Sequence, residues 1–457
     1  MEVRSEDTLR SPDLAGSTVF PSRDTLGGKI LDAPTPKQPW LLYTPSQRWG
    51  LLSILFLVTM SNYFDYYVIS VVLDPIKKEF GVSDTKLGML SGFAFAIIYA
   101  FAALPVARWA DRGNRRTIIT LTLAGWSLMT ALCGIAQSFS QLLMTRLGVA
   151  ITEPGGAPPA QSLIADYFPP ERRATAIAIL LQGGSAVGYG VGIGIGGYVA
   201  ATYGWRMAFL AAGIPGLLLA VLVRFALAEP RLTVGFPAAH SDMESAATGI
   251  AALRKKRSFV LALLGITFYM LFAYGTSVFL PSFMIRDLHA SLAQVSVTWG
   301  TSVTIAMIVG ALLGGPLADR LGRRDIRWYS WIPAAMFAVG APLYWMTLSS
   351  KELWTFIFVD FPAEVVLAIG FSVSFAAIHP VCGSSRRALA VALVYFSMMF
   401  IGCGFGPLLA GALSDALSPT YGLDSIRYAT LTMVAFLVPA SVCLFFAGRA
   451  MPADLEE

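Results

Sequence analysis

The sequence contains few charged residues for its length. Lys, Arg, Asp and Glu together make up 13% of its 457 residues, whereas a soluble domain carries about 25%. The charges that are present cluster, and long stretches between the clusters contain none. Apolar stretches of about 20 residues are long enough to cross a membrane. This composition excludes an ordinary soluble protein and predicts an integral membrane protein.

Histidine and cysteine are also scarce, with 3 and 4 residues respectively. The cysteines show no CxxC spacing, so we expect free thiols and no metal site. The glycines of segment 183–197 are not followed by the Lys-Ser or Lys-Thr of a phosphate-binding loop, and no HExxH motif is present. We therefore expect no cofactor and no enzymatic activity. The net charge of +5 is not arranged in a basic run interleaved with aromatics, so no nucleic-acid partner is expected.

One charged motif occurs twice. Segment 111–116 reads Asp-Arg-Gly-Asn-Arg-Arg, and segment 319–324, 208 residues later, reads Asp-Arg-Leu-Gly-Arg-Arg. Each copy lies between two long apolar runs, which predicts a tight loop at a membrane surface. Two copies at this spacing indicate a duplicated unit. Parallel repeats of several spanning helices are typical of transporters with a site between the two halves.

The apolar runs predict an all-α membrane protein with 12 transmembrane helices in two pseudo-symmetric bundles of six. The predicted domains are a disordered cytoplasmic tail at 1–47, a first bundle at 48–227, a cytoplasmic linker at 228–257, a second bundle at 258–447 and a tail at 448–457. The predicted spans are 49–73, 86–108, 117–137, 141–166, 175–201, 206–227, 258–284, 293–317, 327–348, 353–379, 387–413 and 426–447.

The distribution of basic residues predicts the orientation. Arginines concentrate in loops on one side, including both motif copies, Arg172-Arg173, the cluster 254–257 and Arg386-Arg387. Because cytoplasmic loops are enriched in Lys and Arg, we expect both termini in the cytoplasm. The predicted location is the inner (plasma) membrane of a bacterium. Segment 254–257 is interpreted as an anchor to anionic lipid headgroups rather than a nuclear-localisation signal.

The paired loops resemble the signature of the major facilitator superfamily, Gly-x-x-x-Asp-Arg-x-Gly-Arg-Arg. Segment 315–324 matches it completely, while the first copy has Ala107 in place of the leading glycine. Within that superfamily the first half is similar to the spinster branch at 62–65, 110–116, 146–153 and 166–176. Tyr66 stands where spinster proteins commonly have arginine after the aspartate. The resemblance implies the duplicated fold and, for the spinster branch, movement of a lipid or lysolipid.

Ionisable side chains within spans are functional candidates, because each costs about 2.5–3.5 kcal/mol to insert. Asp65 lies in span 1, and Arg146 and Glu153 lie in span 4, seven residues and therefore two helical turns apart on one face. We predict a proton-coupling network in which Asp65 pairs with Arg146 and Glu153 gains and loses the proton. The alternative is a static ion pair that joins spans 1 and 4.

A second pair of carboxyl groups lies in span 10. Asp360 and Glu364 are four residues apart, and the repeat offset carries Glu153 to a position beside Asp360. Both halves could therefore place a carboxylate at similar depth, although a passive role for the span 10 pair is equally open. A cavity with aromatics and one arginine suits a small amphipathic or aromatic anion. The predicted cavity residues are Tyr63, Tyr66, Tyr99, Trp126, Gln182, Tyr274, Asp360, Glu364 and Tyr395.

The two motif loops are predicted to form an inner gate whose contacts change as the halves rock, since switching requires contacts specific to one state. The alternative is that these residues only set membrane topology. The predicted gate residues are Asp111, Arg112, Arg115, Arg116, Asp319, Arg320, Arg323 and Arg324.

The function predicted from these features is secondary active transport of a small molecule by alternating access, coupled to protons, by a monomer in membrane lipid. No ATP-binding motif is present, so an ion gradient must supply the energy. One alternative is a lysolipid- or sphingolipid-like exporter or facilitator without strict proton coupling. Another is a membrane receptor or scaffold that transports nothing. Substrate identity, import or export, and symport or antiport are left open by the sequence.

Overall fold

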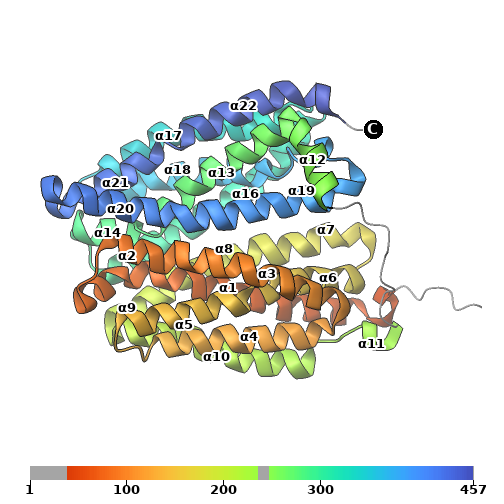
Figure 1. The fold of residues 1–457 in the computed structure, drawn as a ribbon, viewed down its shortest axis with the longest axis horizontal. Coiled ribbons are helices and arrows are strands. Elements are labelled where there is room, and N and C mark those ends of the chain that lie inside the picture. The colour runs from red at the N-terminus through yellow and green to blue at the C-terminus, as the bar shows by residue number, and fades with distance from the viewer. Residues whose placement is uncertain (1–38, 235–245, 456–457) are drawn as a thin grey trace, which may run out of the picture. The chain divides into compact units, whose positions relative to one another are not determined.

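The computed structural model describes residues 39–234 and 246–455, and in these ranges every regular element is helical (Figure 1). Residues from 38 onward form one compact unit. The predicted all-α fold is thereby confirmed. Most of the predicted tail, 1–47, and part of the predicted linker, 228–257, lie outside the described residues.

The N-terminal half contains six spans. Its first helix begins after Thr44, whose side chain accepts from Gln47 N in a capping box. Its elements are η1 (Pro39–Leu42), α1 (Pro45–Phe80), α2 (Asp84–Gly88), η2 (Met89–Phe93), α3 (Ala94–Arg112), α4 (Arg115–Cys133), α5 (Phe139–Thr152), η3 (Glu153–Gly155), α6 (Ala157–Tyr167), α7 (Pro170–Ala178), η4 (Ile179–Gly183), α8 (Gly184–Val191), η5 (Gly192–Gly196), α9 (Gly197–Tyr203) and α10 (Trp205–Ala226).

The C-terminal half repeats this plan after two short helices, α11 (Arg231–Val234) and α12 (Ala246–Lys255). Its elements are α13 (Arg257–Ser277), α14 (Leu280–Arg286), α15 (Leu292–Gln294), η6 (Val295–Trp299), α16 (Gly300–Gly322), α17 (Trp328–Ser349), α18 (Leu353–Ser374), η7 (His379–Val381), α19 (Gly383–Ser397), η8 (Met398–Cys403), α20 (Gly404–Tyr421), η9 (Gly422–Asp424), α21 (Ser425–Val434) and α22 (Leu437–Asp454).

Among the described residues, ten segments are long and apolar enough to cross a membrane. The last of them, 389–454, turns back at Gly422, whose φ of +58° is readily adopted by glycine, and so provides two crossings. Residues 139–167, which carry Arg146 and Glu153, provide the remaining one. The predicted twelve spans are therefore present as two bundles of six.

Spans 2, 5, 8 and 11 connect the two halves, and each contains a wide π-helical turn: η2, η4 and η5, η6 and η8. α2 packs against α20, and α8 packs against α16. Small residues permit this approach. A Cβ at Gly88 would lie 2.2 Å from Pro407 O, and one at Gly190 would lie 2.4 Å from Thr304 Oγ1. The glycines Gly88 of span 2 and Gly190 of span 5 therefore allow each half to pack closely against the other.

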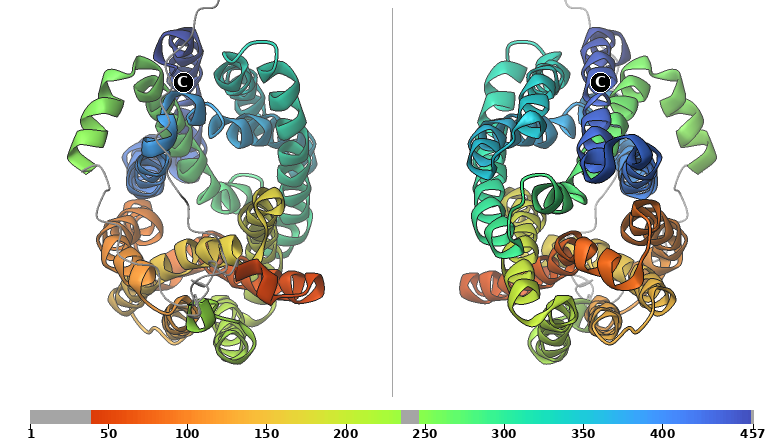
Figure 2. Two further views of the ribbon diagram at one scale, coloured as in Figure 1. Left: turned by 90° about the vertical axis from the view of Figure 1, so that its right-hand side faces the viewer. Right: turned by 90° about the vertical axis from the view of Figure 1, so that its left-hand side faces the viewer.

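The two ends of the bundles are named here by their loops. The signature end holds the turn between α3 and α4 and the loop between α16 and α17, which carry the repeated motif. The opposite end holds the turn between α1 and α2 and segment 287–291. Figure 2 views the helices along their length, from the signature end on the left and from the opposite end on the right. The predicted orientation makes the signature end cytoplasmic.

Candidate functional site

A buried ion pair lies inside the N-terminal half. Arg146 Nη1 of α5 is 3.4 Å from Asp65 Oδ1 of α1, and the two side chains are 1% and 5% exposed. Thr130 of α4 donates a hydrogen bond to the other oxygen of Asp65. The Arg146 guanidinium also lies over the ring of Phe95, 5.4 Å from its centroid. Spans 1, 3 and 4 thus meet at Asp65, and the predicted pairing of Asp65 with Arg146 is present.

Glu153 lies where the helix of span 4 is interrupted. α5 ends at Thr152, and Pro154 and Gly155 continue as the short helix η3 before α6 begins. Glu153 is 9% exposed, and its Oε1 accepts a hydrogen bond from Asn62 Nδ2 at 2.8 Å. Within the described residues it forms no ion pair. The two acidic groups of this half therefore differ: Asp65 has a cation partner, and Glu153 has a neutral amide partner.

Tyrosines from both halves meet beside this network. Tyr66 Oη and Cys403 Sγ lie 3.0 Å apart, which joins α1 to η8 of the C-terminal half. The ring of Tyr66 also contacts Tyr274 and Phe95 at centroid distances of 6.0 and 5.8 Å. Tyr67 contacts Tyr189 at 4.3 Å. The predicted cavity residues Tyr66 and Tyr274 are thus brought together, and Tyr67 belongs with them although its position in an aromatic run gave no distinguishing signal.

The other predicted cavity residues are more dispersed. Tyr63 stacks with Tyr67 at 6.4 Å, and Tyr99 stacks with Phe95 at 6.0 Å. Trp126 is 1% exposed within the hydrophobic core, and its indole nitrogen has no hydrogen-bond partner. Gln182 and Tyr395 are exposed. Asp360 and Glu364 lie in the interior of the C-terminal half, with Asp360 fully buried and Glu364 partly buried.

Charged residues at the opposite end join the two halves, an arrangement called here the opposite-end latch. Arg286 of α14 binds Asp74 of α1 through Nε at 2.6 Å and Asp84 of α2 through Nη1 at 2.8 Å. Lys77 Nζ lies 2.7 Å from the other oxygen of Asp84. Asp74 and Asp84 are 5% and 2% exposed. The sequence placed Lys77 and Arg286 in the loops of this side but gave no sign of their partners.

A carboxylate of span 11 completes the latch. Asp415 of α20 accepts hydrogen bonds from the backbone nitrogens of Asp84 and Thr85, at 2.9 and 2.8 Å. Ser414 donates to Asp84 Oδ2 at 2.8 Å. Hydrogen bonds and ion pairs between the two halves occur here and at the contact of Tyr66 with Cys403. The halves are therefore held together at the opposite end.

Residues of the predicted inner gate are arranged differently. Arg115 is buried, and its Nη2 lies 2.6 Å from both Glu229 Oε1 and Asp166 Oδ2. Arg116 is partly buried, and its Nε has no hydrogen-bond partner. The side chains of Asp111 and Arg112 lie outside the described residues. The gate residues of the second motif, all exposed and without an ion pair to a described residue, are Asp319, Arg320, Arg323 and Arg324.

Arg115 thus holds the loop between α3 and α4 to its own half. Glu229 follows α10, and its side chain is fully buried. Burial alone would raise the pKa of Glu229, but the hydrogen bonds and charge of Arg115 outweigh it and hold the pKa below its usual range. Arg231 donates to the backbone oxygens of Ala110 and Gly113 at 2.9 and 3.0 Å. The start of the linker is therefore anchored to the first motif.

Comparison with known proteins places these features in a family. The family model described as Major Facilitator Superfamily matches residues 55–277 and 262–456, which together cover most of the chain. The boundary between the two matches falls in span 7, and each match covers roughly one half. The same family model thus matches each half of the chain, in agreement with the repeat seen in the sequence.

Three relatives are informative. An MFS-type efflux pump of Mycolicibacterium smegmatis is 34% identical over 90% of this chain and 95% of its own length. A cis,cis-muconate transport protein of Acinetobacter baylyi is 30% identical over 64% of this chain and 71% of its own. The crystal structure of a bacterial homolog of the human lysosomal transporter Spinster, in an inward-facing and unoccupied conformation, matches with a TM-score of 0.81 at 27% identity, over 91% of this chain and 100% of that one.

Proposed function

Because this chain belongs to the Major Facilitator Superfamily, we propose that it is a proton-coupled secondary transporter that moves a small amphipathic or organic-anion substrate by alternating access. Transport by a multi-pass membrane protein of the spinster type is what the family and the fold establish. Proton coupling, the substrate class and the gating residues are the proposed part.

The observation that carries proton coupling is the contrast between the two acidic groups of the N-terminal half. The positive charge of Arg146 compensates Asp65, whereas Glu153 is 9% exposed beside the neutral amide of Asn62. A buried carboxylate without a cation is costly unless it takes up a proton. Arg146 stays charged at any working pH. Proton uptake at Glu153 would therefore change the net charge of this interior cluster without breaking the Asp65 pair.

The opposite-end latch supports the proposal of alternating access. In this structure α1, α2 and α14 share buried ion pairs at the opposite end. The gate residues of the second motif, at the signature end, are exposed. We infer that these latch contacts part when the opposite end opens, and that the motif residues then come together. A proton or substrate can shift the balance only by binding one state more tightly than the other.

The proposed substrate class rests on the interior groups and on one relative. Arg146 is a fixed cation over the ring of Phe95, which in turn contacts Tyr66, and such a group suits an anion with an apolar body. The Acinetobacter baylyi relative is a cis,cis-muconate transport protein. A second candidate, export of an amphipathic molecule without strict proton coupling, is favoured by the identity to the efflux pump of Mycolicibacterium smegmatis.

The test is flux in proteoliposomes with an imposed pH gradient, with labelled cis,cis-muconate as the organic-anion probe and a lysolipid as the amphipathic probe. Intact protein should move at least one probe faster with the gradient than with an uncoupler present. Glu153→Gln should abolish the dependence on the gradient but retain exchange of the probe across the membrane. Asp65→Asn should lower both, because it leaves Arg146 unpaired.

Glu79→Gln is the matched control, because Glu79 also lies on α1 but is 40% exposed and pairs with Arg206 of the same half. It should keep both gradient-driven flux and exchange. Full gradient-driven flux in both Glu153→Gln and Asp65→Asn would reject the proton assignment. Flux of the lysolipid that is insensitive to the uncoupler would instead support the second candidate.

A further inference from the structure

The C-terminal half contains a pair of interior carboxyl groups. Asp360 and Glu364 lie one helical turn apart on α18 and therefore on the same face. Asp360 is fully buried. Within the part of the chain that the structure describes, neither group forms an ion pair with a lysine, arginine or histidine. The transport mechanism proposed above uses neither residue as a proton carrier.

The hydrogen bonds of this pair are incomplete. Asp360 Oδ2 accepts from Trp299 Nε1 of η6 at 2.9 Å, and Glu364 Oε1 accepts from Tyr344 Oη of α17 at 2.9 Å. Asp360 Oδ1 is buried and has no hydrogen-bond partner among the residues that the structure describes. An ionised carboxylate has two oxygens that require donors, and a buried one without them is strongly disfavoured. The vacant Oδ1 is the atom that a proton would occupy.

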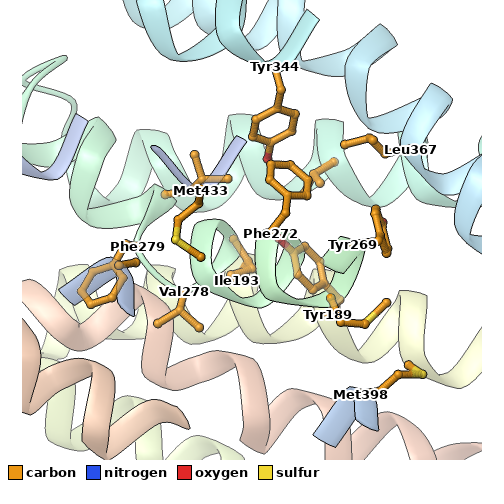
Figure 3. Close-up of a cluster of buried hydrophobic side chains, with 14 of the residues drawn as sticks. Tyr189, Ile193, Tyr269, Phe272, Val278, Phe279, Tyr344, Leu367, Met398 and Met433 are labelled. Atoms are coloured by element: carbon orange, nitrogen blue, oxygen red, sulfur yellow. The ribbon is translucent and has the colours of Figure 1, made fainter. Parts of the chain in front are cut away.

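The described residues around this pair contribute hydroxyl groups but no cations. Tyr344 of α17 and Tyr269 of α13 interact electrostatically with Glu364 from the C-terminal half, and Tyr67 of α1 and Tyr189 of α8 do so from the N-terminal half. Figure 3 shows Tyr189, Tyr269 and Tyr344 in one cluster of buried side chains. Trp299 is the group that η6 directs at Asp360. The polar groups that η6, α17, α13, α1 and α8 present to the carboxyl pair are therefore a neutral indole and neutral tyrosine hydroxyls.

We propose that Asp360 and Glu364 form a second proton-binding site, in the C-terminal half and separate from Asp65 and Glu153. The proton binds at Asp360 Oδ1, and Glu364, which is partly exposed, exchanges it with water. A fully sealed group such as Asp360 admits a proton but no larger cation. This inference concerns proton binding alone and does not require that the proposed transport function is correct.

The test is infrared spectroscopy of the purified full-length protein in lipid bilayers, titrated with protons. Protonated carboxyls give a C=O stretching band that ionised carboxylates lack. Intact protein should show such a band from the buried pair, and Asp360→Asn should remove it. Trp299→Phe deletes the donor to Asp360 and should shift the band to a different frequency without removing it. Glu364→Gln should move the pH midpoint of the Asp360 band, because the neighbouring charge is gone.

Two controls keep the result decisive. Asp325→Asn changes a carboxylate that is 40% exposed in the loop after α16 and should leave the band unchanged. Glu153→Gln should remove a different band. An Asp360→Asn spectrum identical to that of intact protein at every pH would overturn the proposal, as would loss of the same band in Glu153→Gln. A transport assay without gradient dependence would refute the proposed function and leave this spectrum unaffected.

Discussion

Replacement of Arg286 by alanine tests the opposite-end latch most directly. Arg286 is the cation that binds Asp74 and Asp84 across the two halves. Removal of one member of a buried ion pair typically costs about 3–5 kcal/mol, because it leaves an uncompensated buried charge. Lys77 stays 2.7 Å from Asp84, so we expect the lower end of that range. The variant therefore destabilises the state in which the opposite end is closed by this free energy. The open state is not destabilised, because water solvates the carboxylates there.

The expected shift follows from that energy. At 1.36 kcal/mol for each factor of ten, about 3 kcal/mol changes the opening equilibrium about 150-fold, and about 5 kcal/mol about 5,000-fold. Hydrogen exchange followed by mass spectrometry measures this at a defined place. The amides of Asp84 and Thr85 donate to Asp415 across the halves, so they exchange when the latch opens. Their exchange in Arg286→Ala should be faster by about 150-fold.

Arg206→Ala is the matched control. Arg206 lies at the same end and pairs with Glu79, but both belong to the N-terminal half, and the side chains are 35% and 40% exposed. An exposed pair contributes about 0–1 kcal/mol, which corresponds to less than about a sixfold change at these amides. Equal protection of Asp84 and Thr85 in the two variants would refute the interpretation of Arg286 as a clamp between the halves.

Three further predictions use other parts of the structure. Gly411→Ala should speed hydrogen exchange at the amides of Asp84 and Thr85, because its Cβ would lie 2.3 Å from Asp84 O. The control Gly315→Ala should not, since no atom lies within 4 Å of a Cβ at that position. Equal effects of the two variants would contradict the close crossing of α2 and α20. Glu229→Gln should lower the free energy of unfolding by about 3 kcal/mol, since it leaves the buried Arg115 with Asp166 as its remaining acidic partner, and melting should show a much larger loss than in the exposed control Glu171→Gln. Burial raises the pKa of Asp287 to about 7, despite the opposing charge of Arg427. The folded state therefore binds the Asp287 proton more tightly than the unfolded chain does. The stability that this proton contributes is full below about pH 4 and is lost as the pH rises through about 7. Asp287→Asn should flatten the fall in melting temperature between about pH 4 and about pH 7, and an unchanged slope would show that another group causes it.

The sequence predicted those contacts in which a charge stood alone among apolar residues. Arg146 and Asp65 are isolated ionisable groups in long apolar spans, so few partners were available to either, and they do pair. The amide partner of Glu153 was not predicted, because an asparagine such as Asn62 carries no charge that marks it out. The twelve spans and the repeat followed from patterns that cover hundreds of residues.

Contacts at the helix ends could not be predicted from the sequence, for a physical reason. Charged residues are common at the surfaces of a membrane, where water solvates them, so Asp74, Asp84 and Arg286 looked like ordinary loop charges. Their burial depends on how closely the two halves approach, which no local pattern reports. Arg115 is the converse case. The motif marked it as a gate candidate, but only the folded chain shows that Glu229 reaches it.

Glu229 and Arg231 bind residues of the first motif and its neighbours. These contacts indicate where the protein can best be divided into two separately expressed polypeptides. A breakpoint inside segment 235–245 would leave both residues on the first fragment, so that Arg115 kept its partner and the backbone oxygens of Ala110 and Gly113 kept their donor. A breakpoint two residues before Glu229 would instead place one of the two acidic partners of Arg115 on the other fragment and leave only Asp166 with it. Genetic fusions, tags and protease sites should accordingly be inserted after α11, never directly after α10.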